Sequence, residues 1–275
     1  MITDAGPTTV PGGPVPPGAS PPNGGHVPPR ISLRGIRKTF GSIEALRGVD
    51  LDIAPGECVG LIGDNAAGKS TLTKIISGTY IADEGTIEID GRPVRFASPA
   101  DARDLHIEMV FQDLSLCDHI DVMGNLFLGR ERTRFTMLDN GAMRRQARDM
   151  LDALDIRIPN LRAKVAQLSG GQRQAIAIAR AASFEPRVLI MDEPTSALAV
   201  AEVEAVLRLI NRVKAKGVSV ILITHRLQDL FEVCDRIAVM YEGTKVAERA
   251  IGRTSLEDLV KLIVGKGELA IGGAA

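Results

Sequence analysis

GDNAAGKST occupies residues 63–71 and matches G-x-x-x-x-G-K-[ST], a pattern typical of loops that bind nucleotide phosphates. It follows CVGLI (58–62), an apolar run that predicts a buried strand, and it leads into KSTLTKIISGT (69–79), whose apolar spacing predicts a helix. Successive backbone N–H groups in such a turn form a concave anion site, and the helix N-terminus adds the positive end of its dipole. The stretch therefore predicts a phosphate-binding loop between a strand and a helix.

This loop carries the side chains that a bound nucleotide needs. We expect Lys69 to reach the β- and γ-phosphates and the Ser70 hydroxyl to bind Mg²⁺, so ATP and Mg²⁺ are the predicted cofactors. The predicted nucleotide-binding residues of the loop are Gly63, Asp64, Asn65, Ala66, Ala67, Gly68, Lys69, Ser70 and Thr71.

A second acidic site follows a buried-strand run at 188–191, about 120 residues further along the chain. Asp192 is predicted to act on Mg²⁺ through a bound water, the alternative being a carboxylate that caps the next turn. Glu193 is the predicted general base, or water-orienting residue, for attack on the γ-phosphate, the alternative being a surface acid. On an extended chain adjacent side chains point to opposite sides, so the two carboxylates can do different jobs.

The most specific stretch is LSGGQRQAIAIAR, residues 168–180. Ser169, Gly170 and Gly171 open a predicted helix and leave backbone N–H groups free at its N-terminus, which predicts a second site for anions. A helix cap needs only the serine, so the full Leu-Ser-Gly-Gly-Gln string is more specific than capping requires.

These motifs, together with Phe40, Gln112 and His225, stand in the order and spacing of ATP-binding cassette (ABC) ATPases, which the chain resembles over about residues 31–250. The resemblance implies that Phe40 stacks on adenine, although an apolar strand residue is the alternative. It also implies that Gln112 contacts Mg²⁺ or the attacking water and that His225 bonds the γ-phosphate. The implied catalytic residues are Lys69, Gln112, Glu193 and His225, and the implied metal-binding residues are Ser70, Gln112 and Asp192.

The resemblance also implies an assembly of two subunits. Ser169, Gly170, Gly171 and Gln172 would face the ATP bound by the opposite subunit, so one chain would hold two half-sites. We therefore expect a homodimer or pairing with a similar cassette.

Strand patterns alternate with helical patterns on both sides of a helical block. This alternation and the resemblance predict an α/β fold: a P-loop NTPase (RecA-like) core, an antiparallel β subdomain and an inserted α-helical subdomain at about 114–164. The ATPase domain is expected at 30–265, its last helix ending on Gly265. Residues 1–29 hold 9 of the 15 prolines and 6 glycines, which predicts a disordered tail, and 266–275 are expected to be a flexible tail.

Softer cues indicate which kind of cassette this is. The stretches 98–131, 156–161, 224–240 and 254–265 resemble ATPases of bacterial importers for simple sugars. The expected function is ATP hydrolysis coupled to monosaccharide uptake through a separate polytopic membrane permease, indirectly served by an extracytoplasmic sugar-binding protein. The chain would then act at the cytoplasmic face of the plasma membrane, and the segment after Gln112 would dock the permease.

Three alternatives stay open: an ABC transporter ATPase for an amino acid, metal or lipid, a non-transport ABC ATPase, and a catalytically degenerate cassette. A net charge of −1 without a basic domain argues against nucleic acid as a partner. No apolar run reaches the 18 or so residues that cross a bilayer, so a membrane role would depend on a partner. The three cysteines lack metal-ligand spacing.

One position departs from the family. The loop Ser196-Ala197-Leu198 usually ends in Asp, and this chain has Ala199 there. Since that Asp positions the loop and is neither metal ligand nor base, we expect an active enzyme of a particular subfamily. Its isolated dimer should close weakly, because a carboxylate that could bond across the interface is missing.

Overall fold

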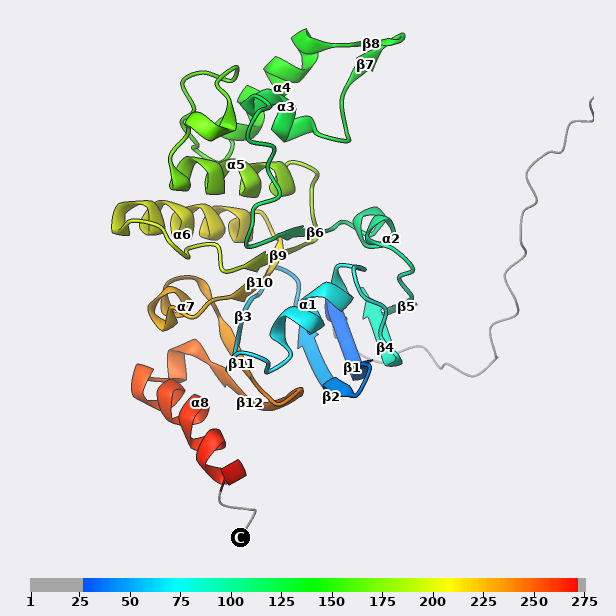
Figure 1. Ribbon diagram of the computed structural model, residues 1–275, viewed down its shortest axis with the longest axis vertical. Helices are drawn as coiled ribbons and strands as arrows, with labels where there is room; N and C mark the ends of the chain where they lie inside the picture. The colour runs from blue at the N-terminus through cyan, green and yellow to red at the C-terminus, as the bar shows by residue number, and fades with distance from the viewer. Residues whose placement is uncertain (1–26, 272–275) are drawn as a thin grey trace, which may run out of the picture.

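The structure is a computed structural model, and it describes residues 27–271 (Figure 1). Its largest sheet has six strands in the order β12-β11-β3-β10-β9-β6, of which only the edge strand β12 runs antiparallel to its neighbour. Their bounds are β3 (Cys58–Ile62), β6 (Ile107–Val110), β9 (Val188–Asp192), β10 (Ser219–Ile223), β11 (Arg236–Tyr241) and β12 (Thr244–Ala250). The predicted P-loop NTPase core is confirmed.

A second sheet is antiparallel and has the order β2-β1-β4-β5. It contains β1 (Ile31–Phe40), β2 (Ile43–Ile53), β4 (Glu84–Ile89) and β5 (Arg92–Val94). Asp90 and Gly91 form the turn between β4 and β5 with φ angles of 50° and 73°, as a tight hairpin requires. The predicted antiparallel subdomain is therefore present.

Helices cover the sheets. They are α1 (Lys69–Ile76), α2 (Pro99–Asp104), α3 (Val122–Phe127), α4 (Asn140–Asp152), α5 (Gly170–Ala182), α6 (Val200–Ala215), α7 (Leu227–Val233) and α8 (Leu256–Ile271). In Figure 1, α3 and α4 lie beyond α5 at one end of the molecule. They form the predicted helical insertion.

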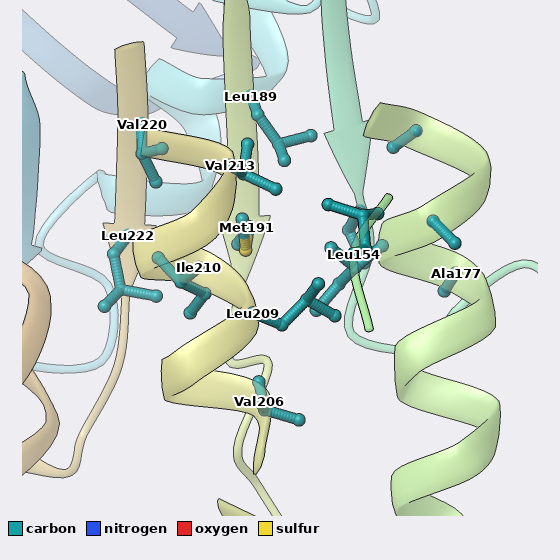
Figure 2. Close-up of a cluster of buried hydrophobic side chains, with 14 of the residues drawn as sticks. Leu154, Ala177, Leu189, Met191, Val206, Leu209, Ile210, Val213, Val220 and Leu222 are labelled. Carbon is teal, nitrogen blue, oxygen red and sulfur yellow. The ribbon is translucent and has the colours of Figure 1, made fainter. Parts of the chain in front are cut away.

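The buried side chains form two clusters, because successive strand residues point to opposite faces of the six-stranded sheet. Leu189 and Met191 of β9 belong to one cluster, whereas Val188 and Ile190 belong to the other. Figure 2 shows the first cluster between the sheet and the helices, with these residues labelled: Leu154, Ala177, Leu189, Met191, Val206, Leu209, Ile210, Val213, Val220 and Leu222. The second cluster includes side chains of α1 and the antiparallel sheet.

Two details differ from the sequence-based predictions. Within the helical block lies a hairpin of two-residue strands, β7 (Thr133–Arg134) and β8 (Met137–Leu138), too short to produce an alternating pattern. The predicted helix end at Gly265 is wrong, because α8 continues to Ile271. An interior glycine costs a helix only about 1 kcal/mol, and good helix formers follow it in the sequence. Of the predicted tail at 1–29, residues 1–26 lie outside the described residues. Of the predicted tail at 266–275, residues 266–271 belong to α8, and 272–275 lie outside the described residues.

Arg236 on β11 connects the two sheets. Its guanidinium donates to both carboxylate oxygens of Glu57, at 2.7 and 2.9 Å, to the Glu248 carboxylate and to the Asp52 carbonyl of β2. Only 18% of its side chain is exposed. These bonds raise the pKa of Arg236, the Glu57 carboxylate having the largest effect although burial opposes it.

We predict that Arg236→Ala lowers the free energy of unfolding by about 2–4 kcal/mol, because it leaves the partly buried Glu57 carboxylate without its cationic partner and Glu248 with Lys245 alone. Urea denaturation of the full chain measures this. The matched control is Arg208→Ala, which removes an exposed pair with Glu204 and should cost roughly 0.5 kcal/mol or less. Equal losses in the two variants would contradict the role of Arg236.

Candidate functional site

The loop 63–71 connects β3 to α1 as predicted, and two of its glycines are required by the backbone. Gly63 and Gly68 have φ angles of 146° and 96°. A Cβ atom would lie 2.1 Å from the Met240 carbonyl oxygen at position 63, and 2.8 Å from the Ala45 carbonyl oxygen at position 68. A side chain at either position would force the loop to move.

Lys69 is held at the centre of this loop. Its ammonium donates to the carbonyl oxygens of Gly63 and Asp64, at 2.7 and 2.8 Å. Burial lowers the pKa of Lys69, while the nearby carboxylates of Glu193, Asp192 and Asp64 act in the opposite direction. Lys69 places a buried cation at the phosphate loop, but the three nearby acids offset its charge, so a polyphosphate would need a further cation there.

Asp192 and Glu193 lie at the carboxyl edge of the six-stranded sheet. Asp192 ends β9 beside Ile223 of β10, and the Glu193 N–H donates to the Ile223 carbonyl at 2.9 Å. Burial raises the pKa of Asp192, and the charge of Glu193 raises it further. Glu193 has a φ of 51°, so the chain is not extended there, and the reason predicted for the separate directions of the two side chains is wrong. The turn itself redirects the backbone after Asp192.

His225 lies against Glu193. It follows β10, and its Nε2 atom is 2.6 Å from Glu193 Oε1. About half of the His225 side chain is exposed, compared with 18% of Glu193. The sequence predicts a role for each residue but not this contact, which requires β9 and β10 to be neighbours.

Two residues missed by the sequence-based prediction hold the segment after Glu193. Thr195 and Asp229 are both buried, and the Thr195 hydroxyl donates to the Asp229 carboxylate at 2.5 Å. Asp229 also pairs with Arg226 at 3.3 Å. The segment is thereby fixed to α7, next to His225. Nothing in the local sequence marks Thr195 or Asp229 as partners.

Gln112 follows β6 at the same edge of the sheet, because β6 pairs in parallel with β9 and places Val110 beside Met191. Its side chain is exposed. The loop behind it is held by Arg180 of α5, which donates to the carbonyl oxygens of Leu114 and Ser115 at 3.0 and 2.8 Å. Burial lowers the pKa of Arg180.

Phe40 ends β1 and is 41% exposed. Its ring lies edge-on to Tyr80 with 5.1 Å between the centroids, and the Lys38 ammonium lies 5.4 Å from the ring centre. An apolar strand residue would be expected to face a core, so the exposure favours a surface role such as stacking on a base. Among the described residues, no hydrogen bond joins Phe40 to the loop 63–71.

Ser169, Gly170, Gly171 and Gln172 are called the signature residues, or signature motif, from here on. They lie at the N-terminus of α5, apart from the phosphate loop. Ser169 is the N-cap, its hydroxyl accepts from the Gln172 N–H at 3.2 Å, and the Gln172 side chain accepts from the Ser169 N–H at 3.1 Å. The predicted helix N-terminus is present. Across 27–271, no hydrogen bond links these residues to the loop 63–71.

The donor set fits magnesium bound together with a nucleotide. Among the described residues no group of three or more His, Cys, Asp or Glu could hold a metal by itself. Mg²⁺ usually takes one or two protein oxygens and completes its shell with phosphate and water. Ser70, Gln112 and Asp192 supply oxygens of this kind. A cation beside Asp192 would also stabilise the charge that burial and Glu193 disfavour there.

Comparison with known proteins gives consistent results. Residues 46–196 match the family described as ABC transporter. The chain is 44% identical over 233 residues to the xylose/arabinose import ATP-binding protein XylG of Sulfolobus acidocaldarius, covering 85% of this chain and 93% of that protein. It is also 44% identical over 242 residues to the ribose import ATP-binding protein RbsA 1 of Rubrobacter xylanophilus, covering 86% of this chain and 47%, about half, of that longer protein.

The fold is similar to that of the ATP-binding cassette MJ0796, solved as a dimer in a post-hydrolysis state with ADP and Pi. The TM-score is 0.70 at 27% identity, and the match covers 80% of this chain and 98% of the other. No helix in residues 27–271 is both long enough and apolar enough to cross a membrane.

Ala199 is the N-cap of α6 and makes no side-chain cap bond. We predict that Ala199→Asp raises the free energy of unfolding by about 0.5–2 kcal/mol, because a side-chain oxygen then accepts an N–H of the first turn. We also expect stronger dimerisation with ATP. Thermal unfolding and sedimentation measure the two effects. Ala199→Asn is the control, since it restores the cap without the charge. Unchanged dimerisation and hydrolysis in Ala199→Asp would contradict a role of the missing carboxylate at the interface.

Proposed function

The chain belongs to the ABC transporter family and is one of its ATPases, and from this premise we propose that it is the ATP-hydrolysing subunit of an importer for a simple sugar. The observation that carries the proposal is the 44% identity to XylG over nearly the whole of both chains. XylG and RbsA 1 are named for pentose import, whereas the sugar taken by this chain is a matter for experiment.

The proposed chemistry assigns one task to each group at the sheet edge. Lys69 binds the β- and γ-phosphate oxygens. Ser70, Asp192 and Gln112 hold Mg²⁺, which when bound neutralises charge on those oxygens. Glu193 orients the attacking water and accepts its proton. His225 is close enough to Glu193 to orient its carboxylate, and with nucleotide bound it donates to the γ-phosphate.

We further propose that the working unit contains two cassettes. The signature residues lie on α5, whereas Lys69 begins α1, and the two groups are not joined by any hydrogen bond in the described part of the chain. A second copy, or a similar cassette, would bring its own signature to the phosphate site of the first. The proposed assembly is two-fold and head-to-tail, with two ATP molecules at the interface.

A groove beside the loop after Gln112 supports the proposed docking of a membrane permease at the cytoplasmic face. Its volume is about 440 Å³, and Phe111, Leu128, Arg180 and Phe184 are among its lining residues. Arg130 also lines it, 2.6 Å from Glu108 and with its guanidinium carbon 3.9 Å from the centre of the Phe184 ring. Apolar side chains and a fixed arginine suit an amphipathic helix of the permease. Movement of that helix would reach Gln112 through this loop.

We predict that Glu193→Gln lowers the turnover number for ATP by about 10²–10⁴-fold while ATP remains bound, because a neutral amide cannot accept the proton of the water. The variant should accumulate as a closed dimer. Phosphate release and sedimentation with ATP measure both outcomes. Glu204→Gln, the same charge change on exposed α6, is the control. Near-normal hydrolysis by Glu193→Gln would reject the role given to Glu193.

The substrate class is tested by reconstituting the chain with a candidate sugar permease and its binding protein. A binding protein loaded with a simple sugar should stimulate ATP hydrolysis several-fold, whereas amino acids, metal ions and lipids should not. Stimulation by one of those ligands alone would favour a different transporter. Stimulation by DNA without any permease would favour a non-transport ATPase.

A further inference from the structure

Glu202, in the first turn of α6, bonds the N-termini of two helices at once. Its Oε1 atom accepts from the Gly171 N–H at 3.0 Å, and its Oε2 atom accepts from the Ala199 N–H at 3.2 Å. These bonds lower the pKa of Glu202: the Gly171 N–H has the largest effect, followed by the Ser169 hydroxyl and the Ala199 N–H. A charged carboxylate therefore connects the signature motif to the end of the loop 196–199.

Capping of α6 does not require the bond to α5. A residue three positions after the N-cap commonly accepts from the N-cap N–H, which is the bond that Glu202 makes with Ala199. The bond to Gly171 is additional. It also depends on glycine, since a Cβ atom at Gly171 would lie 2.9 Å from the Cβ and Cγ atoms of Glu202.

The Gly171 N–H lies in the first turn of α5, where backbone donors have no acceptor within the helix. It can donate its one hydrogen fully to only one acceptor at a time. In the proposed two-cassette assembly, a phosphate oxygen of the partner's nucleotide would approach this N-terminus. It could not take the Gly171 N–H while Glu202 held it, and the two anions would also repel each other. Closure of the dimer would therefore require Glu202 to move.

A cavity next to Glu202 is large enough to hold its side chain in another rotamer. A cavity of about 340 Å³ lies between α5 and α6, and Ser169, Gly171, Glu202, Arg157 and Arg208 are among its lining residues. Arg208 makes only a loose, exposed pair with Glu204 at 3.6 Å, so its charge remains accessible to a second carboxylate. A change of side-chain rotamer within such a space would not require the helices to separate.

We propose that Glu202 is a displaceable internal ligand of the signature motif: it occupies the Gly171 N–H in the separate subunit and gives it up to the partner's γ-phosphate when the dimer closes. Glu202 is a positioning residue, because it touches neither substrate nor metal. Its charge raises the ATP concentration needed for closure. This inference rests on the proposed function, since it needs a second cassette that brings ATP.

The test uses the full chain in the Glu193→Gln background and titrates Mg-ATP while sedimentation measures the dimer fraction. Glu202→Gln should lower the ATP concentration for half-maximal dimerisation roughly three- to tenfold, as expected when a competing charge-assisted bond is weakened. Glutamine still suits the capping position, so the variant should fold. Glu232→Gln, the same charge change at an exposed position of α7, should leave the ATP concentration unchanged.

A second measurement uses chains that keep Glu193. There Glu202→Gln should lower the KM for ATP with little change in kcat, a separation that a loss of structure would not produce. The proposed displacement would be overturned if Glu202→Gln needed the same ATP concentration as the parent for half-maximal dimerisation, or a higher one. If the parent neither dimerises nor hydrolyses ATP, the proposed function itself fails. The two failures are therefore distinguishable.

Discussion

The hydrogen-bond ladder that places β3, β10 and β9 side by side in parallel is the interaction on which the site depends. Parallel strands end at the same edge of a sheet. This edge therefore brings together three segments that are far apart in the sequence: the loop after β3, His225 after β10 and Asp192 at the end of β9. The bond from the Glu193 N–H to the Ile223 carbonyl continues this ladder by one residue. It brings Glu193 to His225, and a slip in register would separate the proposed base from the histidine that contacts it.

The charges at this edge are costly to bury and are held for a ligand. Burial lowers the pKa of Lys69 and raises that of Asp192, so the surroundings disfavour the charged form of each residue. Two adjacent carboxylates beside one ammonium leave an excess of negative charge that a divalent cation can neutralise. A nucleotide bound together with its cation would offset this imbalance of charge. Because one ammonium does not balance these carboxylates, the phosphate loop needs its backbone N–H donors as well as Lys69 to bind a phosphate.

Local patterns and the family resemblance were sufficient to predict the fold and where the candidate site residues lie in it, because the phosphate loop, the strand-borne acids and the signature helix are each encoded in fewer than fifteen consecutive residues. The chemical roles of those residues stay predictions. Contacts between distant segments were not predictable in this way. The pairing of Arg236 with Glu57, the bonds from Arg180 to the loop after Gln112 and the contact between His225 and Glu193 all depend on strand order. The positive φ of Glu193 was missed because the sequence pattern there is that of an extended strand. The continuation of α8 past Gly265 was missed because a glycine can either end a helix or lie inside one.

Ala199 and Glu202 are linked at the N-terminus of α6, where the Ala199 N–H donates to the Glu202 carboxylate. The alanine cannot cap α6, and the backbone N–H at that position is satisfied by the carboxylate three residues later. That same carboxylate reaches across to Gly171. An acid at position 199 would place a second negative charge beside Glu202 at the N-terminus of α6, where the two side chains would accept from different N–H groups, as in a capping box. With alanine there, the single carboxylate of Glu202 accepts from both helix ends. Under the proposed displacement, the signature motif can do without the acid that usually ends the loop 196–199, because Glu202 occupies the Gly171 N–H until a phosphate replaces it.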